Sequence, residues 1–390
     1  MNPPLFRAGV CRATAWACAA GFVSAAAACR ERTPDVAQPF VAYTAVERAR
    51  TDPAAALTWA YAMDVDRRGN LYVGDRWTIR IFGPDGRALG SVGRQGRGPG
   101  EFDAIASVSL TPGDSLFVFD GGLRRVTLLE PGTWRAAYTV QVGRDQLLPP
   151  LRVRRVREGR SLWAAFESAY MLGGQTNPGP RGASIVARLL NADGSGGGGP
   201  VLSVPGRENL VFRDPDAVSP NPFGRVTHLA FASRDRVVAL WSDSLKFDVY
   251  SADGRHLQTI RPGYSPPRRP ITAEERDSVV AELADELVPE ASVRRALDEH
   301  GATTWPLVQE MVVDDQDRVW VGITGGRGEP HRWTAFDMNG ARVAQVELPV
   351  NALLRLVRGS TAYVVELDDN DVPQVVIYDL KPTSTHTIRR

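Results

Sequence analysis

Histidines and carboxylate runs are the first residues in this chain that could do chemistry. There are five histidines, and no two of them have the spacing that places two metal ligands on one strand or helix. His228 is the leading candidate for a ligand or a base, because it lies near the start of an expected inner strand. A structural role is the alternative. His331 is a second candidate, in an expected binding loop beside Arg332 and Trp333.

Two further motifs have ordinary explanations. The run Asp368 to Asp371 holds three carboxylates, which suit a hard cation, but it lacks the spaced ligands and the final Glu of a dedicated calcium loop. We expect a hairpin turn there. The glycine-rich segment Gly93 to Phe102 leads into a strand and not into a helix, so it lacks the helix N-terminus that phosphate-binding loops use. No metal or cofactor is expected, and catalysis has little support.

Arginine and tryptophan offer a different kind of site. Both are enriched at binding hot spots, because they combine a large contact area with directed hydrogen-bond donors. The sequence gives these ligand-binding candidates: Arg76, Trp77, Arg94, Arg124, Arg225, His228, Trp305, His331 and Arg332. Solvated surface arginines are the alternative. We favour a recognition surface over an active site.

The elements that must position these residues repeat six times along the chain. Each repeat has four strand-length runs separated by polar turns, and an apolar second run follows each first turn. We place the repeats at 61–93, 105–143, 151–205, 226–262, 307–348 and 352–390. Asp-Gly or Asn-Gly pairs, typical of tight hairpins, separate the third and fourth runs in four of them. The pattern predicts an all-β fold, a six-bladed β-propeller over 41–390, which the spare strand 40–46 closes.

The first repeat also carries a family resemblance. Its strands, followed by GRQGRGPGEF at 93–102, resemble an NHL repeat, and MVVDDQDRVWVG at 311–322 resembles the core strands of that repeat. The chain as a whole resembles the bacterial six-bladed propeller lipoproteins of the NHL-like group. That group includes scaffolds, ligand binders and a few enzymes. Calcium-dependent lactonases resemble this fold too, but they need polar ligands at several inner-strand starts, and the starts expected here are mostly apolar.

Long connections are expected to gather on one face of the propeller. Turns between strands one and two, and three and four, are uniformly short. The long segments all connect strands two and three or successive blades, which places them on the opposite face. The largest is a helical insertion at 264–306 between blades four and five. A capping box at Thr272 and Glu275 predicts a helix to Val288, and a second helix follows at 291–300. They could pack on the propeller or gate a site.

The first residues are typical of an export signal. Residues 1–28 have a basic start, an apolar stretch and a small-residue end, and Cys29 follows as in a bacterial lipobox. We predict a signal peptide at 1–28, lipidation of Cys29, a linker at 29–40 and a place in the cell envelope. Simple cleavage or a cytoplasmic protein are the alternatives. Two cysteines lie in the signal peptide and the third is Cys29, so the chain after cleavage keeps at most one cysteine. The remainder has 44 basic and 45 acidic side chains, which argues against nucleic acid as a partner.

Together these patterns favour a non-enzymatic function. We expect an exported, lipid-anchored propeller that recognises a protein, peptide or glycan through its loop-rich face. The alternative is a propeller enzyme, a lactonase-like hydrolase or a lyase, with a metal or His228 at the channel mouth. A purely structural envelope component is a third hypothesis.

Overall fold

The computed structural model describes residues 40–142, 150–156, 162–167, 184–195, 199–213, 216–326 and 328–386. The predicted signal peptide, the lipidation site Cys29 and all but the last residue of the linker lie outside these ranges. So does most of the long loop expected in blade three.

Five blades are four-stranded antiparallel sheets in simple sequence order. They are blade one with β2 (Ala62–Val65), β3 (Leu71–Asp75), β4 (Thr78–Phe82) and β5 (Ala88–Val92), and blade two with β6 (Ile105–Leu110), β7 (Leu116–Asp120), β8 (Arg125–Leu129) and β9 (Ala136–Gln141). Blade three has β10 (Arg152–Arg155), β11 (Leu162–Glu167), β12 (Ser184–Leu190) and β13 (Leu202–Pro205), and blade four has β16 (Thr227–Phe231), β17 (Val237–Trp241), β18 (Phe247–Tyr250) and β19 (His256–Ile260). Blade five has β20 (Val308–Val313), β21 (Val319–Ile323), β22 (His331–Phe336) and β23 (Arg342–Leu348).

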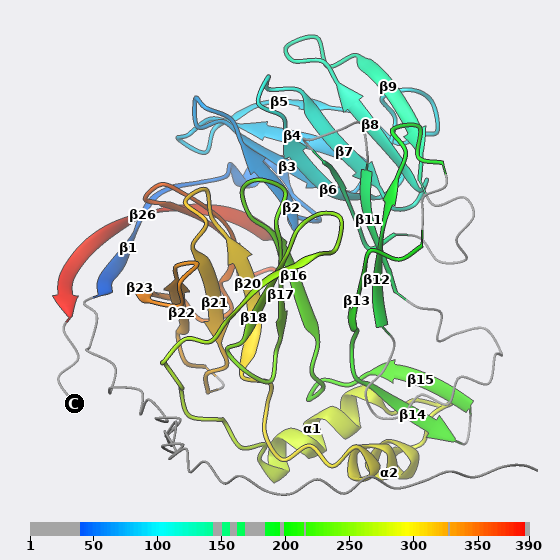
Figure 1. Cartoon of the computed structure of the whole chain (residues 1–390), viewed down its shortest axis with the longest axis vertical. Helices are drawn as coiled ribbons and strands as arrows, with labels where there is room; N and C mark the ends of the chain where they lie inside the picture. Colours follow the sequence, from blue (N-terminus) through cyan, green and yellow to red (C-terminus); the bar gives the residue numbers. More distant parts are fainter. Residues whose placement is uncertain are drawn as a thin grey trace, which may run out of the picture. The chain divides into compact units, whose positions relative to one another are not determined.

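The sixth blade combines both ends of the domain. It contains β24 (Leu353–Arg358), β25 (Thr361–Leu367) and β26 (Pro373–His386), and its fourth strand is β1 (Phe40–Arg50), which pairs antiparallel with β26. The first residues of β1 also pair in parallel with β23 of blade five. The described residues therefore form a six-bladed β-propeller, as the sequence predicts (Figure 1). The spare strand at 40–46 closes the ring and extends to Arg50.

The apolar core lies between neighbouring blades. The second strand of blades one, two and five is buried at every position, as expected for a strand covered on both faces. One cluster joins Ile79 and Val92 of blade one to Ile105 and Leu116 of blade two, with Phe102 fully buried between them. Removing apolar surface from water is the main favourable contribution to folding. A blade can bury its apolar faces only by packing against its neighbours.

Tight hairpins also bring successive blades together. Gly86 and Gly254 lie between the third and fourth strands of their blades with φ of +80° and +85°, which disfavours any residue with a side chain. A Cβ on Gly86 would lie 2.0 Å from the carbonyl oxygen of Arg50, and one on Gly254 would lie 1.6 Å from that of Val201. These glycines are therefore needed for the turn and for its approach to the preceding blade.

The insertion between blades four and five holds two helices, as predicted. They are α1 (Ala273–Leu283) and α2 (Glu290–His300), and the capping box of Thr272 and Glu275 is formed. The prediction that the first helix reaches Val288 is wrong. The carboxylate of Asp285 accepts the backbone N–H groups of Leu287 and Val288, at 2.8 and 2.7 Å, and holds a turn where the helix was expected to continue.

A short β-hairpin from an earlier part of the chain packs against these two helices. Strands β14 (Asn209–Arg213) and β15 (Asp216–Pro220) occupy the segment between blades three and four, where the sequence suggested only a long connection. Leu210 and Phe212 pack with Val280, Val293 and other buried residues of the two helices. Figure 1 shows β14 and β15 beside α1 and α2. We call the hairpin and the two helices the cap.

Candidate ligand site at the axial end of the loop-rich face

The loop-rich face is the one that carries the connections between strands two and three and between successive blades. Every inner strand starts at this face, so the first residues of the six inner strands lie around the propeller axis. Arg152 is the first residue of β10, His228 the second of β16, Glu310 the third of β20 and Arg355 the third of β24. Four blades therefore contribute a polar side chain close to the axis.

Electrostatic contacts connect these side chains. Arg355 Nη1 donates to Glu310 Oε1 at 3.3 Å, and Arg152 lies close enough to Arg355 for their charges to repel. Arg152 and Arg207 both act on the charge of His228, and Arg207 forms a backbone bridge to Val226, next to β16. We call these five residues the axial cluster: Arg152, Arg207, His228, Glu310 and Arg355.

Positive charge dominates the axial cluster. It contains three guanidinium groups and one carboxylate. The Arg152 side chain is exposed to solvent, yet it is surrounded by protein, and both this desolvation and the charge of Arg355 lower its pKa. Desolvation also raises the pKa of Glu310, although the nearby Arg355 acts in the opposite direction. A negatively charged ligand would relieve the repulsion among the arginines.

Three buried atoms of the cluster have no hydrogen-bond partner among the described residues: Nε2 of His228, Oε2 of Glu310 and Nε of Arg355. Desolvation lowers the pKa of His228 to about 4, despite a hydrogen bond with the backbone of Val308, and Arg152 and Arg207 lower it further. The imidazole is therefore neutral at pH 7. Its Nε2 atom and Oε2 of Glu310 are buried and unpartnered. Leaving such an atom unsatisfied costs about 1–3 kcal/mol, so a ligand that bonds to it has an advantage.

An exposed aromatic pair lies next to the cluster. Trp59 and Tyr61 are 49% and 51% exposed, and their ring centroids are 4.7 Å apart at an interplanar angle of 60°. The guanidinium of Arg355 lies 4.7 Å from the centroid of the Tyr61 ring, a cation–π contact. The aromatic pair, Trp59 and Tyr61, is therefore adjacent to the axial cluster.

The buried carboxylate of Asp75 holds the turn that presents this pair. Its Oδ1 accepts the backbone N–H groups of Thr58 and Trp59, both at 2.9 Å, and the Thr58 hydroxyl at 2.7 Å. Asp120 does the same in blade two, where it accepts the backbone N–H groups of Asp103 and Ala104. A carboxylate at the end of the second strand thus fixes the connection that enters the inner strand.

Backbone irregularities occur near the start of three inner strands. Leu354 and Leu356 pair with the consecutive residues Val364 and Tyr363 of β25. Arg355 between them is therefore the extra residue of a β-bulge. Gln309 in β20 and Ala106 in β6 occupy corresponding bulges. Bulges change the direction of side chains and are common beside functional sites. The bulge in β24 places Arg355 between Glu310 and Tyr61.

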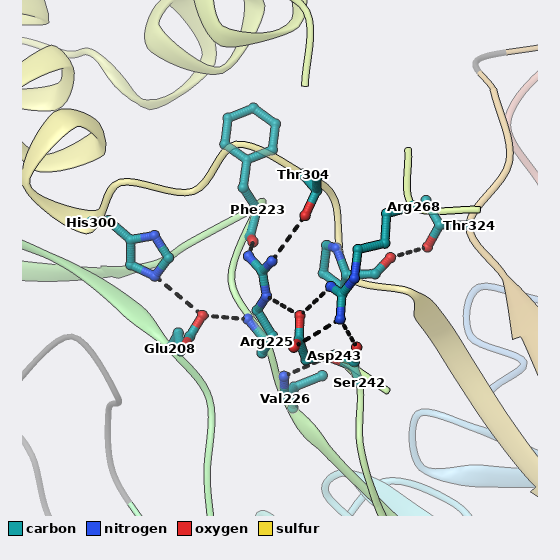
Figure 2. Close-up of polar contacts among 11 residues, drawn as sticks. Glu208, Phe223, Arg225, Val226, Ser242, Asp243, Arg268, His300, Thr304 and Thr324 are labelled. Atoms are coloured by element: carbon teal, nitrogen blue, oxygen red, sulfur yellow. Dashed lines mark hydrogen bonds and ion pairs between the residues drawn. The ribbon is translucent and has the colours of Figure 1, made fainter. Parts of the chain in front are cut away.

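A separate polar network lies at the base of the cap (Figure 2). The Arg225 side chain donates to Asp243 Oδ1 at 3.1 Å, to the Phe223 carbonyl at 3.1 Å and to Thr304 Oγ1 at 3.2 Å. Arg268 Nη1 donates to the same oxygen of Asp243 at 2.7 Å. Desolvation raises the pKa of Asp243, but the hydrogen bonds from the two arginines outweigh it and the pKa is lowered. These contacts tie the cap to blade four.

Glu208 extends this network toward α2. Its Oε2 accepts the backbone N–H of Arg225 at 2.8 Å and lies 3.2 Å from Nε2 of His300. Desolvation raises the pKa of Glu208, yet these hydrogen bonds lower it overall. The carboxylates and guanidinium groups of this network bond to one another within the protein, which suits a structural join, although Nδ1 of His300 is buried without a partner among the described residues.

The structure brings only some of the sequence candidates together. His228 belongs to the axial cluster, and Arg225 to the network at the base of the cap. Trp305 is close to that network: its Nε1 donates to Glu275 at 3.1 Å, and its ring lies 4.8 Å from that of Phe223. It thus packs within the cap.

The remaining candidates are dispersed over the loop-rich face. Arg76 lies over Trp77, 4.8 Å from the ring centroid. Exposed Arg94 pairs with Glu101 at 2.8 Å. Arg124 is half-buried in the turn before β8. His331 and Arg332 begin β22, where Arg332 pairs with Glu347 at 3.2 Å.

Sequence reasoning missed most of the axial cluster. The expectation that inner-strand starts are mostly apolar holds at Ala62, Ile105, Val308 and Leu353. The charged residues Glu310 and Arg355 lie two positions beyond the last two of these. Trp59 and Tyr61, just before the first inner strand, were missed as well. A polar residue within the first three positions of four inner strands is the signal that could have identified the cluster: Arg152, His228, Glu310 and Arg355.

No three His, Cys, Asp or Glu side chains among the described residues are placed to hold a metal ion together. Asp368 accepts the backbone N–H groups of Asn370 and Val372, at 2.8 and 3.0 Å, within the turn between β25 and β26. This is the hairpin turn that the sequence suggested. In the same described ranges, no helix has the length and apolar character to cross a bilayer.

Comparison with known proteins supports the fold and little else. No family model and no curated protein matches the sequence. Similar solved structures include a candidate exported protein from Bacteroides fragilis, with a TM-score of 0.50, and a member of the DUF4221 family from Bacteroides vulgatus, with a TM-score of 0.51. Each is 9% identical, and each match covers 88% of this chain and 95% of the other. The class defined by fold and comparison is the six-bladed β-propeller.

Proposed function

We propose that this chain is an exported, lipid-anchored binding module of the NHL-like group. It recognises a glycan, a peptide or a protein through its loop-rich face. The observation that supports this most is the axial cluster, where arginines outnumber carboxylates and buried polar atoms lack partners. The cap and the exposed aromatic pair lie on the same face. Elaborated segments on a rigid scaffold are the usual place for recognition.

The test is to block one face at a time. Arg76 lies in the turn between β3 and β4, on the loop-rich face, and Arg87 in the turn between β4 and β5, on the opposite face. A polyethylene glycol chain attached through Arg76→Cys should abolish binding to an array of defined oligosaccharides and peptides. The same attachment through Arg87→Cys should not. Equal binding by both derivatives, or loss only with the Arg87 derivative, would contradict the proposal.

Export and anchoring rest on the leader alone. Its composition and the small residues before Cys29 support signal cleavage followed by lipidation. We expect wild-type protein expressed in a bacterial host to be found in the membrane fraction and to be released by detergent. Cys29→Ala should instead be absent from the membrane fraction. A substituted chain that still partitions with the membrane fraction would rule out an anchor at this cysteine.

An enzyme remains the second candidate function because of His228. Its unpartnered Nε2 lies beside arginines that could hold an anionic substrate, an arrangement that a hydrolase or lyase could use. Turnover of a lactone panel that is lost in His228→Gln would favour this reading. Absence of turnover by the wild type would favour the binding module.

A further inference from the structure

We propose that the axial cluster and the aromatic pair together bind a uronate unit of an acidic glycan. This inference rests on the proposed function and narrows its ligand from a glycan, peptide or protein to a sugar that carries a carboxylate.

The charge of the cluster favours an anionic ligand group. Among the described residues, no carboxylate lies within ion-pair or hydrogen-bond distance of Arg152 or Arg207, and the one that pairs with Arg355 belongs to Glu310. With His228 neutral, the five side chains carry a formal charge of +2, from three guanidiniums and one carboxylate. A guanidinium presents a planar fork of donors that matches a carboxylate. The carboxylate of a ligand would bind between Arg152 and Arg355.

The same cluster also calls for hydroxyl groups. Oε2 of Glu310 is an acceptor without a donor, and Nε2 of His228 is a buried nitrogen without a partner. A simple carboxylate such as acetate offers neither atom a hydrogen. A uronic acid carries a carboxylate and several hydroxyls on one ring, so it can satisfy the arginines, Glu310 and His228 together.

The aromatic pair provides a surface for the sugar ring. Trp59 and Tyr61 are about half exposed, and Tyr61 contacts Arg355 directly. An aromatic ring offers an apolar face, and a pyranose has an apolar face of C–H groups that can pack on it. The site thus combines cations, neutral polar atoms and an apolar surface within a few residues.

The positive charge is local, which favours a short acidic ligand. The chain after the leader has nearly equal numbers of basic and acidic side chains, so the molecule lacks the general basic excess that attracts long polyanions such as nucleic acid. Other arginines on this face are paired, for example Arg94 with Glu101 and Arg332 with Glu347. Among the described residues, Arg152 and Arg207 of the axial cluster have no ion pair and lie beside His228, so their guanidinium groups are available to a ligand there.

Isothermal titration of the purified chain with trigalacturonate tests the proposal. Wild type should bind it, with an affinity that falls as salt increases, and should bind neutral trigalactose at least tenfold more weakly. Arg152→Gln should weaken binding of trigalacturonate roughly 10- to 100-fold, as expected for a lost charge-assisted hydrogen bond. Arg152→Lys keeps the charge but not the planar fork of donors, so its affinity for trigalacturonate should lie between those of wild type and Arg152→Gln. Trp59→Ala should weaken binding about 2- to 12-fold.

Arg87→Gln is the matched control, because it removes an exposed arginine on the opposite face and should change the affinity less than twofold. Circular dichroism checks that each variant is folded. Failure of wild type to bind trigalacturonate, or equal affinity of wild type and Arg152→Gln, would overturn the uronate site. If a peptide or neutral glycan then binds and a polymer on the loop-rich face blocks it, the binding-module proposal survives. If citrate binds as tightly as trigalacturonate and Trp59→Ala has no effect, the sugar assignment is wrong.

Discussion

Replacing Asp75 with alanine should destabilise the fold by about 2–4 kcal/mol. The carboxylate is 5% exposed and accepts three hydrogen bonds, from the backbone of Thr58 and Trp59 and from the Thr58 hydroxyl. A hydrogen bond to a charged group contributes about 1.5–3 kcal/mol, and a buried donor left without a partner costs a similar amount. Thr58 and Trp59 are themselves exposed, so water will replace part of the loss. For this reason we expect less than the full sum.

Urea denaturation measures this change in the free energy of unfolding. Asp75→Asn keeps the shape and one acceptor oxygen, so it should cost about 1 kcal/mol. Asp85→Ala is the control, since that exposed turn carboxylate accepts one bond, from the Arg87 backbone at 3.2 Å, and should cost less than 1 kcal/mol. If Asp75→Ala is no more destabilising than Asp85→Ala, Asp75 does not hold the turn before β2. The turn would then need another support.

Three more predictions concern the scaffold and the site. Gly254→Ala should destabilise the fold by at least 2 kcal/mol in denaturation, because φ is +85° and the new Cβ would lie 1.6 Å from a backbone oxygen; Gly113→Ala, in open space, should be neutral. His228 has its pKa lowered to about 4 in the folded chain against 6.5 unfolded, so the unfolded state binds more protons and stability should fall by about 3 kcal/mol from pH 7 to pH 4. The free energy of unfolding of His228→Gln should therefore fall less over this pH range than that of wild type. The same pH dependence in both proteins would contradict the role given to His228. Arg125→Gln should speed amide exchange at Gly96, because Arg125 donates to three carbonyls of the loop between blades one and two.

The propeller could be predicted from the sequence because its signals are local. Each blade contains an apolar second strand next to a polar turn, and Asp-Gly or Asn-Gly pairs fix several of the outer hairpins. The structure adds the reason for glycine at these turns, since Gly86 and Gly254 touch the backbone of the preceding blade. That approach is a tertiary contact and cannot be read from the turn itself.

The cap was predicted only in part, for a related reason. The capping box of Thr272 is local and was identified, whereas the turn made by Asp285 ended the helix earlier than its apolar pattern indicated. Strands β14 and β15 are five residues each, and the run Leu210, Val211 and Phe212 in β14 is apolar throughout, so its sequence lacks the alternation that would predict a half-buried strand. Their stability comes from packing on α1 and α2.

The axial cluster was the least predictable feature. Arg152, His228, Glu310 and Arg355 come from four blades and span about half of the chain. Their convergence depends on ring closure, and the position of Arg355 depends on a β-bulge. Single-residue reasoning could identify His228 near the axis, but it had no means of pairing it with arginines from other blades.

A crystal structure of the chain with trigalacturonate is the most direct test of the central claim. We predict that a uronate carboxylate lies between Arg152 and Arg355, with a ring hydroxyl near Glu310 and a sugar face against Trp59 or Tyr61. Density for the trisaccharide elsewhere, or an empty axial cluster at a saturating concentration, would contradict it.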